Sequence, residues 1–72
     1  MAIIKNVGDA DLNLSGFILE KGKEMPLDDN KFISLVMMNR SFHSAINRGW
    51  VEVHSTNPKV VFIVEDVVRN GR

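Results

Sequence analysis

The chain has 72 residues, with nine basic and nine acidic side chains, two histidines and no cysteine. Its length permits one domain at most, and a domain of this size buries only about 60% of the surface that its unfolded chain exposes. The absence of cysteine excludes disulfides and thiolate–metal sites, and the balanced charge without a basic cluster disfavours a dedicated nucleic-acid binder. Part of the stability could come from neighbouring chains, which favours an oligomer.

The sequence shows no targeting signal. Residues 1–5 lack the long apolar region and the cleavage pattern of a signal peptide. No apolar run approaches the roughly 20 residues that a membrane span requires. We therefore expect a soluble protein that is made in a cytoplasm and has no membrane partner.

The first half of the sequence predicts three or four short β-strands. Residues 2–7 are mainly apolar and β-branched, and residues 12–15 alternate apolar and polar side chains. The glycine and the aspartates of residues 8–11 suit a turn, so these two segments are expected to form a hairpin. A glycine ends or bends the second strand before the apolar run at residues 17–19. A charged glycine turn then leads into an extended segment, because Pro26 lacks a backbone donor and disfavours helix before it.

A helical region is predicted from about residue 29 to residue 48. Asp28 or Asp29 can cap its N-terminus. Apolar side chains then follow on one face at steps of three and four: Phe32, Leu35, Met38, Phe42, Ala45 and Ile46. The region could be one helix, or two helices broken at Asn39-Arg40 with Ser41 as the second N-cap. A break or kink is preferred, because asparagine can adopt the left-handed conformation and serine is a strong cap.

The end of the chain predicts a second hairpin. Arg48 and Gly49 supply the chemistry that ends a helix. Residues 50–54 alternate and are expected to form a strand, residues 55–59 a turn, and the continuous apolar run at residues 60–64 another strand. The expected fold is therefore a small α+β domain: an N-terminal β-hairpin or meander, one kinked or two short helices, and a C-terminal β-hairpin.

The predicted domain covers residues 1–66, and residues 67–72 are expected to form a flexible or partner-ordered tail. Three apolar residues, Ile33, Val36 and Met37, lie off the main face of the helical region. Either the β layer covers a wide apolar stripe, or part of this face meets another subunit. The run at residues 60–64 needs burial on both faces, which a partner chain could supply. We therefore predict an interface formed by Ile33, Val36, Met37, Val61, Phe62 and Ile63.

No set of residues in the sequence indicates catalysis, a metal site or a cofactor. His43 lies near serines 41 and 44, but a cap and a helix surface account for these serines. His54 could pair with a carboxylate as a pH switch, although a surface histidine is the commoner case. Turn and cap roles explain the four aspartates that superficially resemble a calcium cluster, because the closing glutamate of a calcium loop is absent: Asp9, Asp11, Asp28 and Asp29.

Two further readings concern the region around residue 48. Residues 40–48 could form a recognition helix, in which Arg40, Asn47 and Arg48 would face DNA. The segment is short, lacks a basic cluster and lies between expected hairpins, which disfavours this alternative. Trp50 is the only tryptophan, and we expect it to pack against the helix end in the core, although tryptophan is also a common interface anchor.

The order of these segments resembles small virion proteins of tailed bacteriophages. The resemblance covers residues 3–53, and its parts are an early strand ending at residues 6–7, the segment 12–19, the glycine turn and extended segment 21–27, a helix beginning after residues 28–29, and the closing segment 41–53. The apolar run at residues 60–64 is an extension that this pattern does not require. A strand there would suit exchange with a neighbouring chain, because main-chain pairing gives affinity with little sequence demand.

The resemblance implies a non-enzymatic structural role in a capsid surface, neck, tail or baseplate. We expect a virion component that assembles in multiple copies and contacts larger virion proteins, without cofactor, metal or small-molecule substrate. The alternative is a small cytoplasmic regulatory or nucleic-acid-binding module that uses the segment 40–48.

Overall fold

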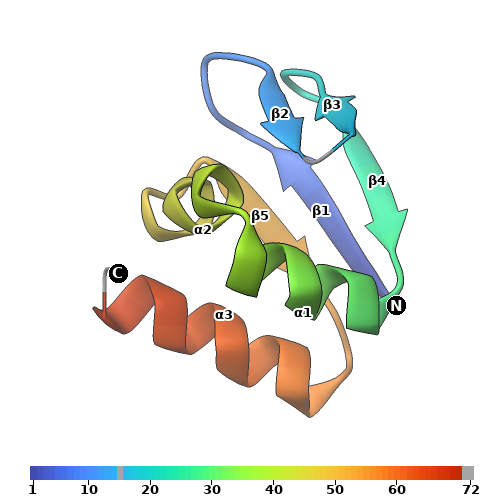
Figure 1. Cartoon of the computed structure of the whole chain (residues 1–72), viewed down its shortest axis with the longest axis vertical. Helices are drawn as coiled ribbons and strands as arrows, with labels where there is room; N and C mark the ends of the chain where they lie inside the picture. Colours follow the sequence, from blue (N-terminus) through green and yellow to red (C-terminus); the bar gives the residue numbers. More distant parts are fainter. Residues whose placement is uncertain (15, 71–72) are drawn as a thin grey trace.

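The computed structural model describes residues 1–14 and 16–70, with the backbone alone for Asn70 (Figure 1). Its elements follow in the order β1 (Ala2–Asn6), β2 (Leu12–Leu14), β3 (Phe17–Leu19), β4 (Glu24–Leu27), α1 (Asp29–Met38), α2 (Arg40–Asn47), β5 (Val51–His54) and α3 (Pro58–Asn70). The predicted α+β class is confirmed, with four short strands in the first half of the chain. The pairing of the strands and the last element differ from the prediction.

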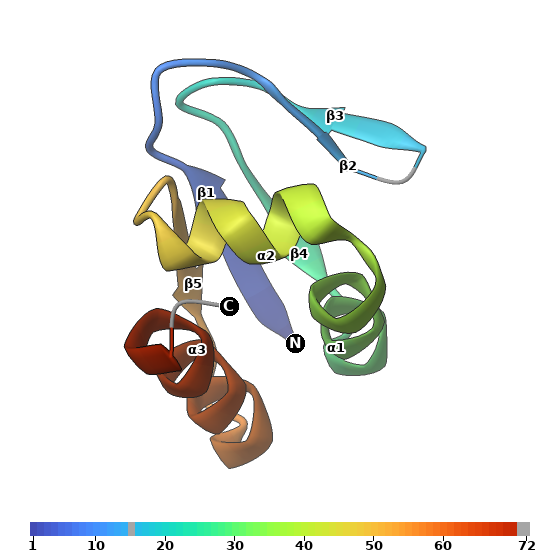
Figure 2. The ribbon, with the colours of Figure 1, turned by 60° about the vertical axis from the view of Figure 1, so that its left-hand side comes forward.

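A three-stranded antiparallel sheet has the order β4-β1-β5, so the first strand lies at its centre. Ile4 lies opposite Met25 on one side and Val53 on the other. Alternate residues of β1 are buried, because α1, α2 and α3 cover one face of the sheet (Figures 1 and 2). The opposite face carries residues such as Lys5 and Glu52 and has no helix over it.

The predicted hairpin between residues 2–7 and 12–15 is wrong. β1 pairs with β4 and β5, whereas β2 pairs with β3 in a separate two-stranded sheet that lies over α2 (Figure 2). The reason is that both edges of β1 are already used by other strands, and the loop that follows β1 is tied to the side chain of Asn6. Ser15, which the prediction included, lies outside the described residues.

Asn6 is a fully buried polar residue that the sequence did not single out. Its Nδ2 donates to the carbonyl oxygens of Ala10 (2.8 Å) and Leu19 (2.9 Å), and its Oδ1 accepts from the backbone N–H of Gly8 (2.9 Å). One side chain thereby joins the loop after β1 to the end of β3. Because its polar atoms have partners, Asn6 can be buried without the cost of an unsatisfied amide.

The helical region contains two helices, which confirms the preferred break at Asn39-Arg40. Asn39 has extended backbone angles (φ −111°, ψ 107°), and its Oδ1 accepts from Phe42 N at 3.0 Å. The second N-cap is therefore Asn39 rather than Ser41, and Asn39 is not left-handed. The rings of Phe32 and Phe42 meet edge to face across the break, with centroids 5.7 Å apart.

The ends of this region follow the predicted chemistry. Asp28 caps α1, because its Oδ2 accepts from Asn30 N at 3.0 Å. Gly49 has a φ of +80°, in the left-handed region that favours glycine, directly after the C-cap Arg48. The chain then turns into β5.

The predicted second hairpin is wrong: residues 60–64 belong to α3, and β5 pairs with β1. Asn57 and Pro58 begin the helix, since Asn57 Oδ1 accepts from Lys59 N at 2.9 Å and proline suits the first helical position. Burial recurs at helical spacing, with Val60 and Val67 buried. Burial of one helix face therefore outweighs the strand preference of the β-branched run. α3 continues past the predicted boundary at residue 66, and residues 71–72 lie outside the described residues.

Among the described residues, one hydrophobic core joins the three helices to the two sheets. Its buried members are Ala2, Ile4, Leu14, Leu19, Leu27, Phe32, Leu35, Val36, Phe42, Ala45, Ile46, Val51, Val60 and Val67. Since this set reaches from the first strand to the second half of α3, the last helix is an integral part of the packing. The apolar side chains left outside the core are the candidates for contact with other molecules.

Candidate interaction surfaces

The outward face of α3 is rich in apolar side chains. Val61, Phe62 and Val68 are exposed there, Phe62 by 68%, and we call these three residues the α3 stripe. Val61 and Val68 are two helical turns apart and share one side of the helix. Glu65 lies one turn after Val61 and is also exposed. The stripe is therefore an apolar surface with a charged residue beside it, on a helix whose residues 60–64 were predicted as a strand and whose end was predicted as a tail.

The predicted contact residues separate into exposed and packed positions. Val61 and Phe62 belong to the α3 stripe, and Met37 at the end of α1 is 76% exposed. Ile33 and Ile63 are half-buried and pack against the core. Val36 is only 3% exposed and is a core residue, because α1 has a second buried flank. Val36 is therefore not available for contact with another molecule. Val68 is an exposed apolar residue that the sequence did not single out.

The exposed face of α2 is polar. An open hollow of about 410 Å³ lies between this face and the segment 11–13. Arg40, Ser44 and Arg48 contribute to its lining from the helix side. Asn47, which the DNA alternative placed beside these arginines, is half-buried and donates its Nδ2 to the carbonyl oxygen of Val67 in α3 at 3.1 Å. The predicted trio is therefore divided between an open face and a packed one.

Trp50 contributes to the lining of this hollow and is 44% exposed, so the expectation that it belongs to the core is wrong. The guanidinium carbon of Arg48 lies 5.2 Å from its ring centroid, within cation–π range. A Cβ added at Gly8 would come within 3.1 Å of Trp50 Cβ. The lack of a side chain at Gly8 therefore lets the loop after β1 pass close to Trp50, and the indole is held between that loop and Arg48.

In the described part of the chain, no hydrogen bond joins a histidine to a serine near it in sequence. His43 is half-buried and lines an open hollow with Val36, Met37, Arg40 and Ser44. His54 lies on the uncovered face of the sheet, with its Nε2 3.6 Å from Glu52 Oε1. Within residues 1–14 and 16–70, no three His, Cys, Asp or Glu side chains are grouped as a metal site would require.

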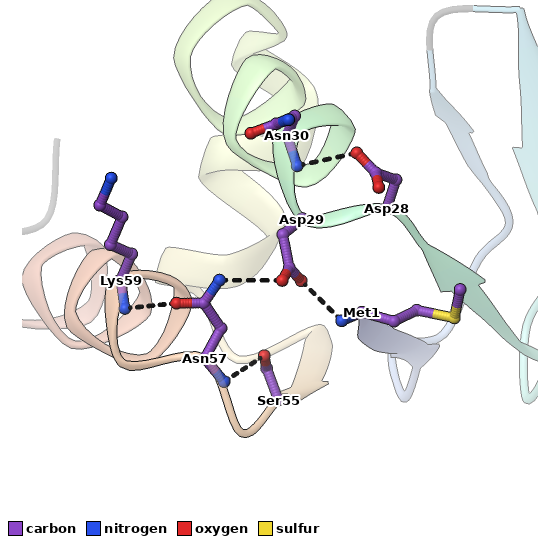
Figure 3. Close-up of polar contacts among 7 residues, drawn as sticks. All are labelled: Met1, Asp28, Asp29, Asn30, Ser55, Asn57 and Lys59. Atoms are coloured by element: carbon purple, nitrogen blue, oxygen red, sulfur yellow. Dashed lines mark hydrogen bonds and ion pairs between the residues drawn. The ribbon is translucent and has the colours of Figure 1, made fainter.

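Three of the four aspartates, Asp11, Asp28 and Asp29, have structural partners. Asp11 Oδ1 accepts from Lys21 N at 2.8 Å. Asp29 Oδ2 accepts from Asn57 Nδ2 at 2.8 Å, and its Oδ1 lies 3.1 Å from the amino group of Met1 (Figure 3). These two hydrogen bonds, that from Asn57 foremost, lower the pKa of Asp29 below its ordinary value of 3.8. Asp29 thus ties the starts of β1, α1 and α3 together, a role that no sequence motif signals.

Comparison of the chain with protein-family models, with curated protein sequences and with solved structures found no match. None of the helices in the described part of the chain has the length and apolar character needed to cross a bilayer.

Proposed function

We propose that this chain is a non-enzymatic structural component of a tailed-phage virion, present in multiple copies and in contact with larger virion proteins. The observation that carries the contact role is the α3 stripe, in which Val61, Phe62 and Val68 are exposed on one helix. Aromatic residues are enriched at protein interfaces, and exposed apolar patches mark contact sites. The virion assignment rests on the order of segments in residues 3–53.

α3 presents its stripe from a fixed position. Val60 and Val67 hold its inner face in the core. Its N-terminal end is tied to α1 by the hydrogen bond from Asn57 to Asp29, and its C-terminal half to α2 by the hydrogen bond from Asn47 to the Val67 carbonyl. A surface that is already rigid loses little conformational entropy on binding. The fixed position of α3 is consistent with a protein that uses this helix to contact other virion proteins.

The stripe can be tested by replacing Phe62 with glutamate in cells that produce the phage particles. A buried contact of this ring would be lost and a charge placed in an apolar interface, so we expect at least tenfold less F62E than wild-type chain in purified particles. Lys23→Glu is the matched control, because it adds a glutamate at an exposed turn position outside the stripe. Equal incorporation of F62E, K23E and the wild type would refute the proposed contact.

The nucleic-acid alternative retains one favourable observation, which is that Arg40 and Arg48 are exposed on the same hollow. They lie eight residues apart on one helix face, about 12 Å along the axis. Against it, Asp11 lines the same hollow and Asn47 faces α3. A DNA titration at two salt concentrations tests this reading: salt-sensitive binding that is lost in Arg40→Ala/Arg48→Ala would favour it over the structural role.

A further inference from the structure

The two edges of the main sheet differ in their capacity to accept another strand. β4 and β5 form the edges, with β1 between them. β4 contains Pro26, which has no N–H, at a position whose backbone faces outward by the alternation of the ladder with β1. Proline on an edge strand blocks pairing with further chains. β5 contains no proline, so the edge at β5 is the one open to pairing.

The hydrogen bonds of β1 fix which groups of β5 point outward. Asn6 N donates to Lys23 O on the β4 side, whereas Val7 N donates to Trp50 O on the β5 side. Since an antiparallel ladder alternates, Lys5 and Ile3 also direct their backbone groups towards β5, where their partners are Glu52 and His54. The N–H and C=O groups of the intervening residue, Val53, therefore point to the open edge. In the described part of the chain, β1 is the strand that pairs with β5, so the outward edge of β5 has no strand beside it.

We propose that β5 pairs antiparallel with β5 of a second copy of this chain, with Val53 opposite Val53 on the two-fold axis. This register joins the outward backbone groups of both Val53 residues and places Glu52 of each copy directly opposite His54 of the other. Such directly opposed residues in a non-hydrogen-bonded pair have the closest side chains in an antiparallel ladder. The sequence Glu-Val-His is thus complementary to itself around its central valine.

The side chains on both faces of β5 suit this partner. On the uncovered face, Glu52 and His54 are 55% and 68% exposed, and their own contact is long, at 3.6 Å. On this face the carboxylates of Glu24 and Glu52 lie on either side of Lys5 in adjacent strands, and the second copy's His54 would place an imidazole beside Glu52 that can donate a hydrogen bond to it. On the covered face, Val53 is only half-buried although its neighbour Ile4 is fully buried. A second Val53 would cover the open side.

The charge pattern favours a second copy over a foreign strand, because isologous pairing needs a surface complementary to itself. With Val51 on the axis instead, Glu52 would lie opposite Trp50. With Glu52 on the axis, two glutamates would lie directly opposite each other, and with His54 on the axis, Glu52 would lie opposite Thr56 rather than a histidine. The Val53 register is therefore the one that satisfies both the backbone and the side chains. Pairing along a four-residue strand buries little surface and is therefore weak by itself. In an assembly of many copies, several such contacts act together and raise the overall affinity.

The inference deepens the proposed multi-copy assembly and names a surface separate from the α3 stripe. Its test is the dissociation constant of the dimer, from sedimentation at increasing concentrations up to the millimolar range, together with hydrogen exchange of the Val53 amide. We expect a concentration-dependent dimer in which this amide becomes protected. His54→Glu should weaken it roughly tenfold by opposing Glu52 with a like charge, and His54→Lys should strengthen it severalfold.

The exchanged variant Glu52→His/His54→Glu is the matched control, because it restores glutamate–histidine pairs in the same register and should keep the wild-type affinity within about threefold. All substituted side chains are more than half exposed, so the fold should persist, which circular dichroism checks. The inference would be overturned if the chain stayed monomeric at every concentration, if the Val53 amide remained unprotected, or if H54E and H54K changed the dissociation constant of the dimer equally. It would also be overturned if F62E weakened the dimer and the substitutions at residue 54 did not. Absence of the chain from particles, with this dimer intact, would refute the virion role only.

Discussion

Replacement of Asn6 by alanine should remove a large part of the stability of the fold. The substitution deletes three hydrogen bonds, to Ala10 O, Leu19 O and Gly8 N. The Leu19 carbonyl bond is buried, and leaving such a group without a partner costs about 1–3 kcal/mol. The other two are partly buried and can exchange for water, so each contributes about 0.5 kcal/mol. The expected loss is about 2–4 kcal/mol, against a total of about 4–11 kcal/mol for 72 residues.

Urea unfolding followed by circular dichroism measures this loss. Asn6→Asp should cost at least as much at neutral pH, because a carboxylate cannot donate to the two carbonyl oxygens and would be a buried charge. Asn13→Ala, at an exposed position of β2, is the control and should change the free energy of unfolding by less than about 0.5 kcal/mol. A loss below about 1 kcal/mol for N6A, or a more stable N6D than N6A, would refute the assignment of Asn6 as the residue that joins the loop after β1 to the end of β3.

Two further outcomes test the helix starts. Asn39→Ala should lower the free energy of unfolding by about 1 kcal/mol because it removes the N-cap of α2, whereas Ser41→Ala should have a smaller effect. Urea unfolding measures both values, and a larger loss for Ser41→Ala than for Asn39→Ala would show that Ser41 is the N-cap. The lowered pKa of Asp29 means that its interactions stabilise the fold at neutral pH and are lost as pH falls below about 4. The stability gap between wild type and Asp29→Asn should therefore narrow in urea melts at pH 3 relative to pH 7, and a gap independent of pH would contradict this linkage.

The parts of the fold that sequence reasoning predicted correctly depend on local chemistry. Asp28 and Gly49 mark helix ends through groups within a few residues of them. The break at Asn39 likewise follows from a side chain that competes with helix continuation. For the same reason the start of α3 could have been found, because Asn57-Pro58 carries the N-cap and first-turn signal. The β-branched run that follows favoured a strand instead.

The incorrect pairings depend on contacts between distant residues. The sequence places a turn between residues 7 and 12, but Asn6 uses its amide to bind Leu19, 13 residues away, and β1 pairs with strands from both halves of the chain. No local pattern encodes such a choice. The same limit affected the contact residues: helical spacing identifies the off-face position Val36, but only the packing of the folded chain shows that a second layer buries it.

The most direct test of the structural role is the copy number of the wild-type chain in phage particles purified by density gradient and washed at high salt, measured by quantitative mass spectrometry against the major capsid protein. We predict a fixed ratio that corresponds to several copies per particle and survives the wash. A chain that is absent from the washed particles, or present at a ratio that varies between preparations, would contradict the account.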